Sequence, residues 1–340
     1  MMKILIDAFG GDNAPDEIIA GTIEAINEKQ GFTAVLVGDQ EIIAEKLKAY
    51  KYDSERVEIM HATDVITCEE EPTVAIRRKP NSTICVAFKE LKENEDAKAF
   101  VSAGSTGAVL VGATLKLGRI QGVNRPAPCP ILPTVIDGKQ VYLMDSGANV
   151  DCKPINLCQF ALMASAFAES FGVENPKVAL LSNGTEDEKG NALNHEVFPL
   201  LKSMKTINFV GNIEARDILS GDYDVVVTDG FAGNVCLKAI EGTAMSVMKM
   251  IKNEIYSSFR GKLGGLILKP VFAKLKDKLD YNKTGGALFL GVNKPVIKAH
   301  GSAKRVAMKA AVLQAVRCAE HDVSTKIKER LAGEEINLQQ

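Results

Sequence analysis

The chain has 340 residues, of which 46% are hydrophobic and 25% charged, so its composition is that of an ordinary globular protein and excludes the disordered and fibrous classes. The formal net charge of -2 points to no partner, and the lack of Trp with only 6% aromatic residues argues against a stacking surface for nucleic acid. No apolar run reaches about 18 residues, so no transmembrane helix is expected.

The first third of the chain alternates strand-like and helix-like segments. Strands are predicted at 3–6, 33–37, 57–60 and 97–101. Helices are predicted from Pro15 to residue 26, at 42–47 and at 82–91. Strands that alternate with helices through short turns indicate a parallel sheet covered on both faces.

Two hairpin signals interrupt this alternation. Strand-like runs at 131–136 and 141–144 flank an Asp-Gly turn, and runs at 288–290 and 296–298 flank a second turn. Between the hairpins we predict helices at 157–171 and 235–255, with strands at 177–181, 208–210 and 224–227. A last helix follows Ser302.

No linker, repeat or low-complexity tract divides the sequence. We therefore expect one α/β domain with two lobes over residues 1–333 and a frayed tail at 334–340. The seven cysteines are scattered without a C-x-x-C pair and there are only four His, so neither a metal site nor a disulfide framework is expected. Reduced thiols of a cytoplasmic protein are the simplest interpretation.

The most informative pattern is a set of small, polar, glycine-containing turns that follow the predicted strands. The six turns lie at 7–12, 102–107, 145–149, 182–186, 228–234 and 300–302. The carboxyl ends of parallel strands lie along one edge of a sheet, so we expect these turns to gather there. Glycine permits close backbone approach, and helix N-termini favour anions, so the set predicts a phosphate-like ligand.

Each turn alone is weak evidence, because Gly and Asn also serve simply to connect strands to helices. The sequence has no G-x-G-x-x-G after a strand and no P-loop, H-E-x-x-H or G-x-S-x-G motif, which removes the common nucleotide, zinc-protease and hydrolase signatures. With no standard nucleophile, bound phosphate could itself attack an activated carbonyl. Lys189, Lys298 and His300 are the candidate charged groups, although Lys298 could be a solvated cation and His300 a helix cap.

The same residues resemble the bacterial phosphate acyltransferases of phospholipid synthesis. Asp7-Ala8-Phe9-Gly10-Gly11-Asp12-Asn13-Ala14-Pro15 is similar to their D-A-M-G-G-D-x-A-P opening, and further matches run in family order to about residue 325. These matches are the segments at 102–108, 125–127, 145–151, 183–187, 211–216, 228–235 and 298–302. The departures are slight: Phe9 replaces the usual Met, Ser105 a common Asn and Ser146 a common Val.

The resemblance implies transfer of a long-chain acyl group from acyl carrier protein to inorganic phosphate, giving acyl phosphate for a membrane glycerol-3-phosphate acyltransferase. It also implies a three-layer α/β/α fold with a mostly parallel, doubly wound sheet, akin to isocitrate/isopropylmalate dehydrogenases and phosphotransacetylases. A homodimer without metal or other cofactor is implied as well.

We assign candidate residues from the turns and the resemblance together. The candidate catalytic residues are Lys189, Asp229, Asn234, Lys298 and His300. The candidate phosphate- or substrate-binding residues are Asp7, Gly10, Gly11, Gly104, Ser105, Thr106, Gly107, Asp145, Asn149, Asn183, Gly184, Thr185, Gly230, Gly233 and Ser302. Backbone N–H groups at 104–107 and 229–234 are the expected donors to phosphate and oxyanion.

The segment 260–283 carries seven basic and two acidic residues around an apolar tip and a helical leucine pattern. Such a basic amphipathic segment suits an anionic membrane surface, which would place the enzyme at the inner face of the cell membrane. The candidate membrane residues are Leu263, Leu266, Ile267, Leu268, Phe272, Lys274 and Lys276. The leucines could instead pack on the body or a dimer partner, and the basic residues, with those at 77–79, could receive the acidic carrier protein.

Two other functions stay open at this point. One is a phosphotransacetylase-like enzyme that uses acyl-CoA as the donor. The other is a non-catalytic protein that binds acyl phosphate or acyl carrier protein, which predicts tight binding without turnover.

Overall fold

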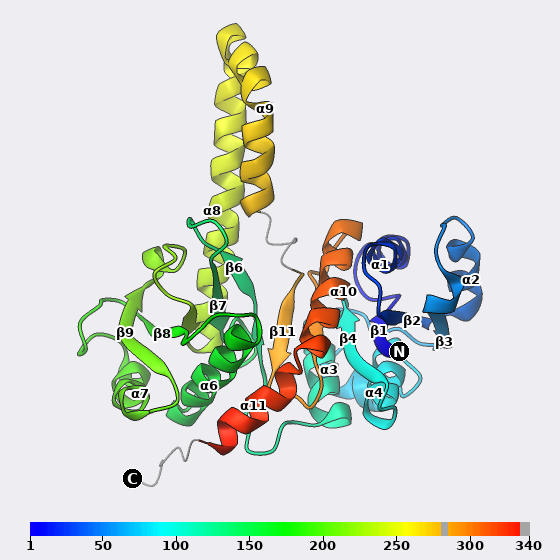
Figure 1. Ribbon diagram of the computed structural model, residues 1–340, viewed down its shortest axis with the longest axis horizontal. Coiled ribbons are helices and arrows are strands. Elements are labelled where there is room, and N and C mark those ends of the chain that lie inside the picture. The colour runs from blue at the N-terminus through cyan, green and yellow to red at the C-terminus, as the bar shows by residue number, and fades with distance from the viewer. Residues whose placement is uncertain (280–284, 334–340) are drawn as a thin grey trace.

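The computed structural model describes residues 1–279 and 285–333, with side chains from 276 to 279 left out. Its strands form two sheets, one in each lobe (Figure 1). Within the described residues, no helix is long and apolar enough to cross a bilayer.

The first sheet has seven strands in the order β3-β2-β1-β4-β12-β11-β5. The four strands β3, β2, β1 and β4 and the neighbouring β12 all run parallel, whereas β11 is antiparallel to β12 and β5. Their bounds are β1 Met2–Asp7, β2 Phe32–Gly38, β3 Val57–His61, β4 Ala97–Ser102, β5 Ala127–Cys129, β11 Ala287–Leu290 and β12 Val296–Lys298. The parallel strands bring the ends of β1, β4 and β12 to the same edge.

Helices cover both faces of this sheet because its strands are apolar on both sides. On one face α1 (Asp16–Glu28) packs against α10 (Arg305–Glu320), and on the other α4 (Thr83–Glu93) packs with α3 and α5. The bounds of α3 are Pro72–Arg78, and those of α5 are Thr106–Gly112, followed by a π-helical turn, Ala113–Leu117. At the outer edge α2 (Gln40–Leu47) contacts β3, which a 3₁₀ turn, Ser54–Arg56, precedes.

The second sheet has five strands in the order β6-β7-β10-β8-β9, all parallel except β6. Their bounds are β6 Ile131–Pro133, β7 Gln140–Met144, β8 Lys177–Ser182, β9 Asn208–Glu214 and β10 Val225–Val227. On one face α6 (Pro154–Ser170) packs with α7 (Ala192–Ser203) and α11 (Val323–Ala332). The first turns of α8 (Gly230–Ser257) cover the other face, near a 3₁₀ turn, Ala215–Asp217.

One buried apolar cluster continues from the first lobe into the second. It includes Ile4 and Met308 around the first sheet, Phe160 on α6, and Tyr142 and Val225 in the second sheet. The α6 helix is almost wholly buried and apolar on all sides, which suits a helix enclosed between layers. The two lobes therefore share one core.

The long α8 and the following α9 (Phe259–Leu279) form a helical hairpin that projects from the body (Figure 1). Pro270 lies inside α9. A proline in a helix leaves one carbonyl without its usual donor, here the carbonyl of Leu266, a residue that is 68% exposed. The α9 helix continues past Pro270 and packs along α8.

The structure confirms the predicted strands and both hairpins, which appear as β6–β7 and β11–β12. It adds elements that the pattern did not predict: α3, α5, α7 and β5. The second hairpin carries β12 into the first sheet beside β4. The tail at 334–340 lies outside the described residues.

Candidate active site

The six glycine-containing turns gather in two groups of three, rather than along one edge. The turns after β1, β4 and β12 meet at the edge of the first sheet, because these three strands are neighbours. The turns after β7, β10 and β8 meet in the same way in the second sheet. The expectation of a single edge was wrong because the strands belong to two sheets.

In the first group, direct hydrogen bonds join the turns. The Ser102 hydroxyl donates to Asp7 Oδ2 over 2.7 Å and accepts from the Gly104 N–H over 3.0 Å. Asp12 donates its N–H to the Gly301 carbonyl over 2.8 Å, and the Asn13 amide donates to the Ser302 carbonyl over 3.0 Å. All three turns are therefore held in fixed relative positions.

Glycine is required where these turns approach one another. A Cβ at Gly10 would lie 2.4 Å from Asp7 Oδ2 and 2.8 Å from the Gly104 nitrogen. Gly11 has φ +97°, and its Cβ would lie 2.8 Å from the Gly301 carbonyl oxygen. Side chains at either position would push the turns apart.

Lys298 is the buried cation of this group. It ends β12 with 8% of its surface exposed, and Nζ donates to the carbonyls of Ala103, over 3.2 Å, and Ala299. Burial lowers the pKa of Lys298 to about 8, although the nearby Cys68, Asp7 and Asp12 favour the charged form. Burial likewise raises the pKa of Asp7, against the hydrogen bond from Ser102. Lys298 is thus part of the buried group and not a solvated cation.

His300 and Ser302 lie on the exposed side of the same group. His300 Nδ1 lies 2.8 Å from the Ser302 hydroxyl and accepts the Ser302 N–H over 3.2 Å. An Nδ1 that accepts this bond leaves the proton of a neutral imidazole on Nε2. His300 therefore holds its own turn, while the following helix α10 begins at Arg305.

The turn at 102–107 leads directly into α5. The Ser105 hydroxyl caps this helix by accepting the Ala108 N–H over 3.4 Å. Thr106 is exposed and Gly107 packs on Pro72, where a Cβ would come within 2.6 Å. Ser105 thus orients the first N–H groups of α5.

In the second group, Asp145 organises its own turn. Its carboxylate accepts the N–H groups of Gly147 (2.8 Å), Ala148 (3.0 Å) and Asn149 (2.7 Å), and the Asn149 amide (2.8 Å). Burial raises the pKa of Asp145, and these hydrogen bonds oppose the rise. The bonds occupy both carboxylate oxygens, so Asp145 and Asn149 shape the turn.

The start of α8 packs closely against the Asp145 turn. A Cβ at Gly230 would lie 2.7 Å from the Asn149 carbonyl oxygen, and one at Gly233 only 1.8 Å from that of Asp145. The Gly230 N–H donates to the Asn149 carbonyl over 2.8 Å, and Asp229 caps α8 by accepting the Ala232 N–H over 2.8 Å. Asn234 lies beside Gly147 on the exposed side.

The remaining candidates lie on the turn after β8. Asn183 and Thr185 are exposed and Gly184 is buried. The Lys189 side chain lies over Gly184, where a Cβ would come within 2.7 Å of Lys189 Cγ. Lys189 itself is exposed. This turn is therefore the most open of the six.

The second group is also tied to the first sheet. The Asn149 amide donates to the carbonyl of Pro126, the residue before β5, over 3.1 Å. The Ser146 hydroxyl donates to the carbonyl of Pro128, which lies within β5, over 3.3 Å. The two groups are thus joined through the edge strand of the first sheet.

Comparison with known proteins identifies the family. A family model described as "Fatty acid synthesis protein" matches residues 2–326. A phosphate acyltransferase from Clostridium novyi is 48% identical over 333 residues, covering 97% of this chain and 98% of the relative. One from Bacillus cereus is 48% identical over 314 residues, covering 92% and 93%.

The chain belongs to the phosphate acyltransferase family. Its fold is shared with a phosphotransacetylase from Streptococcus pyogenes, with a TM-score of 0.62, 16% identity and 94% of each chain covered. A phosphotransacetylase from Staphylococcus aureus gives a TM-score of 0.59 at 18% identity, again covering 94% of each chain. The family resemblance seen in the sequence is confirmed, as is the α/β fold.

A large groove in this phosphate acyltransferase family member was not predicted from the sequence. It has a volume of about 2040 Å³, begins at Ser182, Asn183, Thr228 and Asp229, and follows α8 toward α9. Arg216 is the last residue of the matched segment 211–216, whereas Leu219, Ala239 and Thr243, which also line the groove, lie outside every motif. The predicted helix at 235–255 is the sequence signal for Ala239 and Thr243.

Proposed function

We propose that this protein transfers a long-chain acyl group from acyl carrier protein to inorganic phosphate, releasing acyl phosphate and the carrier thiol. Membership in the phosphate acyltransferase family supports acyl transfer to phosphate. The structural observation that carries the proposal is the convergence of three turns around the buried Lys298. The acyl carrier protein donor follows from the resemblance of the motifs.

Phosphate is assigned to the first group of turns. Gly10, Gly11 and Gly104 allow the three turns to pack closely together, and the N-terminal N–H groups of α5 follow the same end of β4. The Lys298 ammonium supplies the positive charge that a phosphate dianion needs, and the His300 Nε2–H a neutral donor. Ser302, Thr106 and Gly107 complete the proposed phosphate site.

The acyl thioester is assigned to the second group. A phosphate oxygen attacks the thioester carbonyl, the new C–O bond forms, and the tetrahedral oxyanion collapses as the C–S bond breaks and the carrier thiolate leaves. A thiol has a pKa near 8.5, so its thiolate leaves with little help from a general acid. The proposed oxyanion donor is the Phe231 N–H at the start of α8, which lies between the bonded N–H groups of Gly230 and Ala232. Asn234, one turn along α8, and Lys189, on the turn after β8, are the proposed polar side chains of this site.

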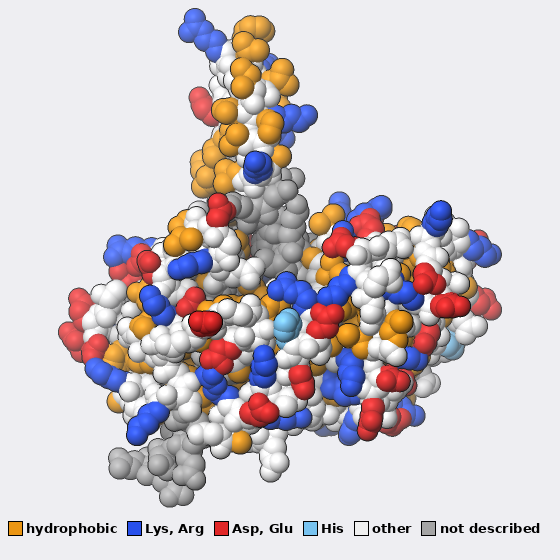
Figure 2. Space-filling model, viewed as in Figure 1, with side chains coloured by type: hydrophobic (Ala, Val, Ile, Leu, Met, Phe, Trp, Pro, Cys, Tyr) orange, Lys and Arg blue, Asp and Glu red, His pale blue; other side chains and the backbone are white. Residues whose placement is uncertain are grey.

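We assign the projecting hairpin to docking on an anionic membrane. Phe259 is 83% exposed, Leu266 68% and Ile267 72%, and the stretch from 260 to 275 holds four basic residues and no acid. Figure 2 shows the hydrophobic side chains gathered over this hairpin, with basic side chains among them. Apolar side chains among exposed basic ones are the pattern of a surface-binding helix.

The other candidate membrane residues fit this docking surface. Leu263, Leu268 and Lys274 are exposed and Phe272 is half-buried, whereas the Lys276 side chain lies outside the described residues. A long-chain acyl phosphate is poorly soluble in water, so release at the membrane would deliver it to a membrane glycerol-3-phosphate acyltransferase. In this proposal the enzyme is a cytoplasmic homodimer that associates peripherally with the membrane and needs no cofactor.

The test is phosphate-dependent release of free carrier thiol from a long-chain acylated carrier protein. The wild-type protein should release thiol only with phosphate present, and Lys298→Met should lower kcat/KM by about 10²- to 10³-fold through loss of a charged donor. Lys48→Met, at a lysine whose side chain is 73% exposed on the far edge of the first lobe, is the matched control. Transfer from acetyl-CoA but not from the long-chain donor would instead support a phosphotransacetylase, and tight binding without turnover a binding protein.

A further inference from the structure

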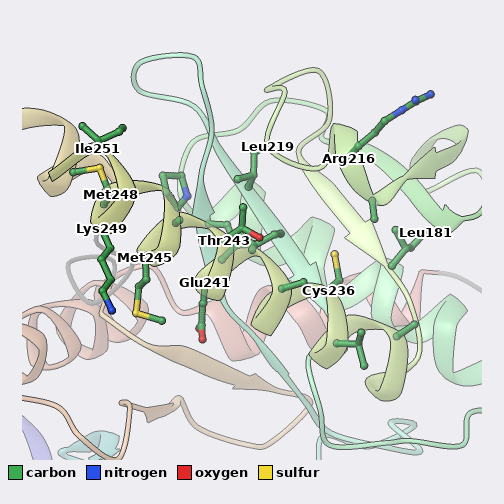
Figure 3. Close-up of a pocket in the computed structure, with 18 of the residues that line it drawn as sticks. Leu181, Arg216, Leu219, Cys236, Glu241, Thr243, Met245, Met248, Lys249 and Ile251 are labelled. Carbon is green, nitrogen blue, oxygen red and sulfur yellow. The ribbon is translucent and has the colours of Figure 1, made fainter. Parts of the chain in front are cut away.

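The groove along α8 connects the second group of turns to the projecting hairpin. One end is formed by polar residues, Asn183, Thr228 and Asp229. From there it passes between α8 and the side chains of Leu181 and Leu219. It then continues between α8 and α9, along Phe272 and Leu266, as far as Tyr256 and Lys262. Figure 3 shows Thr243 of α8 directed toward Leu219, with Cys236 and Leu181 nearer the sheet.

Beyond its polar end, the groove is lined mainly by apolar and small side chains. The α8 residues on this path include Ala232, Cys236, Ala239, Ile240, Ala244 and Met248. Ala239 and Thr243 are exposed and lie one helical turn apart, so small side chains leave the groove open along its length. Arg216 stands at the side with 76% of its side chain exposed.

The dimensions fit a long aliphatic chain and not a compact ligand. Pockets for small ligands commonly have volumes of about 300–1,000 Å³, well below the 2040 Å³ found here. At a rise of about 1.5 Å per residue, Ala239 lies about 15 Å and Thr243 about 21 Å along α8 from Asp229. Apolar side chains dominate the lining between the polar end at Asp229 and the basic residues Lys249, Lys252, Lys262 and Lys269 along the hairpin, and such a long apolar path suits an aliphatic chain with one polar end.

We propose that this groove holds the acyl chain of the substrate, with the thioester carbonyl at Thr228 and Asp229 and the methyl end toward the α8–α9 hairpin. The inference rests on the proposed function, because it takes the thioester to lie at the start of α8. The length of the groove then determines which acyl chain length the enzyme prefers. It also leads the acyl phosphate from the reacting end to the exposed apolar tip, so that chain release and membrane docking share one path.

Chain-length selectivity tests this inference directly. Each methylene buried in the groove strengthens binding about fourfold. Ala239→Phe should therefore lower kcat/KM for a hexadecanoyl donor by about 16- to 64-fold through loss of two or three buried methylenes, and should move the preferred donor to shorter chains. Thr243→Phe lies farther along the path and should shorten the preferred chain by less.

Ser246→Phe is the matched control, because Ser246 is an exposed small residue of α8 that does not line the groove. It should keep the wild-type preference. If Ala239→Phe and Thr243→Phe also keep that preference while the wild-type protein is active, the groove does not hold the acyl chain. A change of oligomeric state with unchanged chain preference, measured by light scattering, would likewise overturn the inference and identify the groove as an interface between two copies.

A binding measurement separates this inference from the proposed function. Palmitic acid should displace a fluorescent fatty acid from the wild-type protein and from Ser246→Phe, and at least about tenfold less effectively from Ala239→Phe. This readout needs no turnover, so it still tests the groove if no donor transfers its acyl group to phosphate. Equal displacement from all three proteins would contradict the inference.

Discussion

Lys298 combines burial with a charge that the surrounding carbonyl groups only partly satisfy. Its pKa of about 8 lies below that of an exposed lysine, because burial disfavours the ammonium. The folded protein thus binds fewer protons than the unfolded chain between pH 8 and 10.5. The contribution of this group to the free energy of unfolding is therefore least favourable below pH 8 and improves as the pH rises toward 10.5.

The same shift predicts how catalysis depends on pH. As the pH rises through about 8, Lys298 loses its charge, so the KM for phosphate should rise by roughly tenfold per pH unit once the neutral form predominates. Lys298→Arg keeps the charge over this range and should remove that rise, whatever its effect on the rate at pH 7. A KM for phosphate that rises equally in both proteins would contradict the assignment of Lys298 to phosphate.

Gly233 tests the contact between α8 and the Asp145 turn. A Cβ there would lie 1.8 Å from the Asp145 carbonyl oxygen, so Gly233→Ala must displace the turn or the helix. We expect a loss of at least about 1–3 kcal/mol in the free energy of unfolding, measured in urea. Gly242→Ala is the control on the same helix: a Cβ there meets nothing within 4 Å, so the substitution should stabilise by about 0.5–1 kcal/mol. Similar effects of the two substitutions would contradict the described packing.

At the residue scale, the sequence predicted which residue types line the turns but not what each one does. Ser105 and Asp229 look like ligand-binding residues in the motif, yet both cap helices, and Asp145 is bonded within its own turn. The burial of Lys298 could not be predicted either, since it depends on how β12 joins β4. The caps and the Asp145 bonds are contacts within a few residues, whereas the burial of Lys298 depends on residues far apart in the chain.

At the scale of elements, the α8–α9 hairpin is the feature that distinguishes this molecule from a simple α/β layer structure. Large apolar side chains of this hairpin are exposed. Exposed groups of large apolar residues usually mark an interaction site. The proposed membrane docking would use both the apolar tip and its basic neighbours.

Docking predicts that Leu266→Glu with Ile267→Glu will abolish binding to anionic vesicles. Burial of each side chain in the interface contributes about 1.5–3 kcal/mol, so losing two should weaken partitioning at least about 100-fold in a sedimentation assay. Ile42→Glu, at an apolar residue of α2 that is 43% exposed, should bind vesicles as the wild-type protein does. Unchanged vesicle binding by the double variant would contradict docking through the hairpin.

The hydrophobic periodicity of the sequence predicted most of the helices and strands correctly, but it did not predict which strands pair with one another. The alternation of strands and helices and both hairpins follow from local patterns. The division into two sheets does not, since β5 joins one sheet and β6 the other although only Pro130 separates them. Pro130 has no N–H to donate to a ladder, which explains a break there, but no pattern shows which sheet each half joins.

At the scale of the whole molecule, one buried cluster links the two lobes. Such a shared core predicts that both lobes unfold together as one domain. Urea unfolding followed by far-UV circular dichroism and by hydrogen exchange of amides in β1 and in β8 should give one midpoint. Two separate midpoints for these strands would show that the lobes are independent domains.

Phosphate is the proposed nucleophile, held by the turns after β1, β4 and β12. The most direct measurement uses oxygen-18-labelled phosphate with a long-chain acyl-acyl carrier protein and determines the mass of the acyl phosphate formed. If a phosphate oxygen attacks the carbonyl carbon, all four labelled oxygens remain in the product. Loss of one label, or no phosphate-dependent product, would contradict the account.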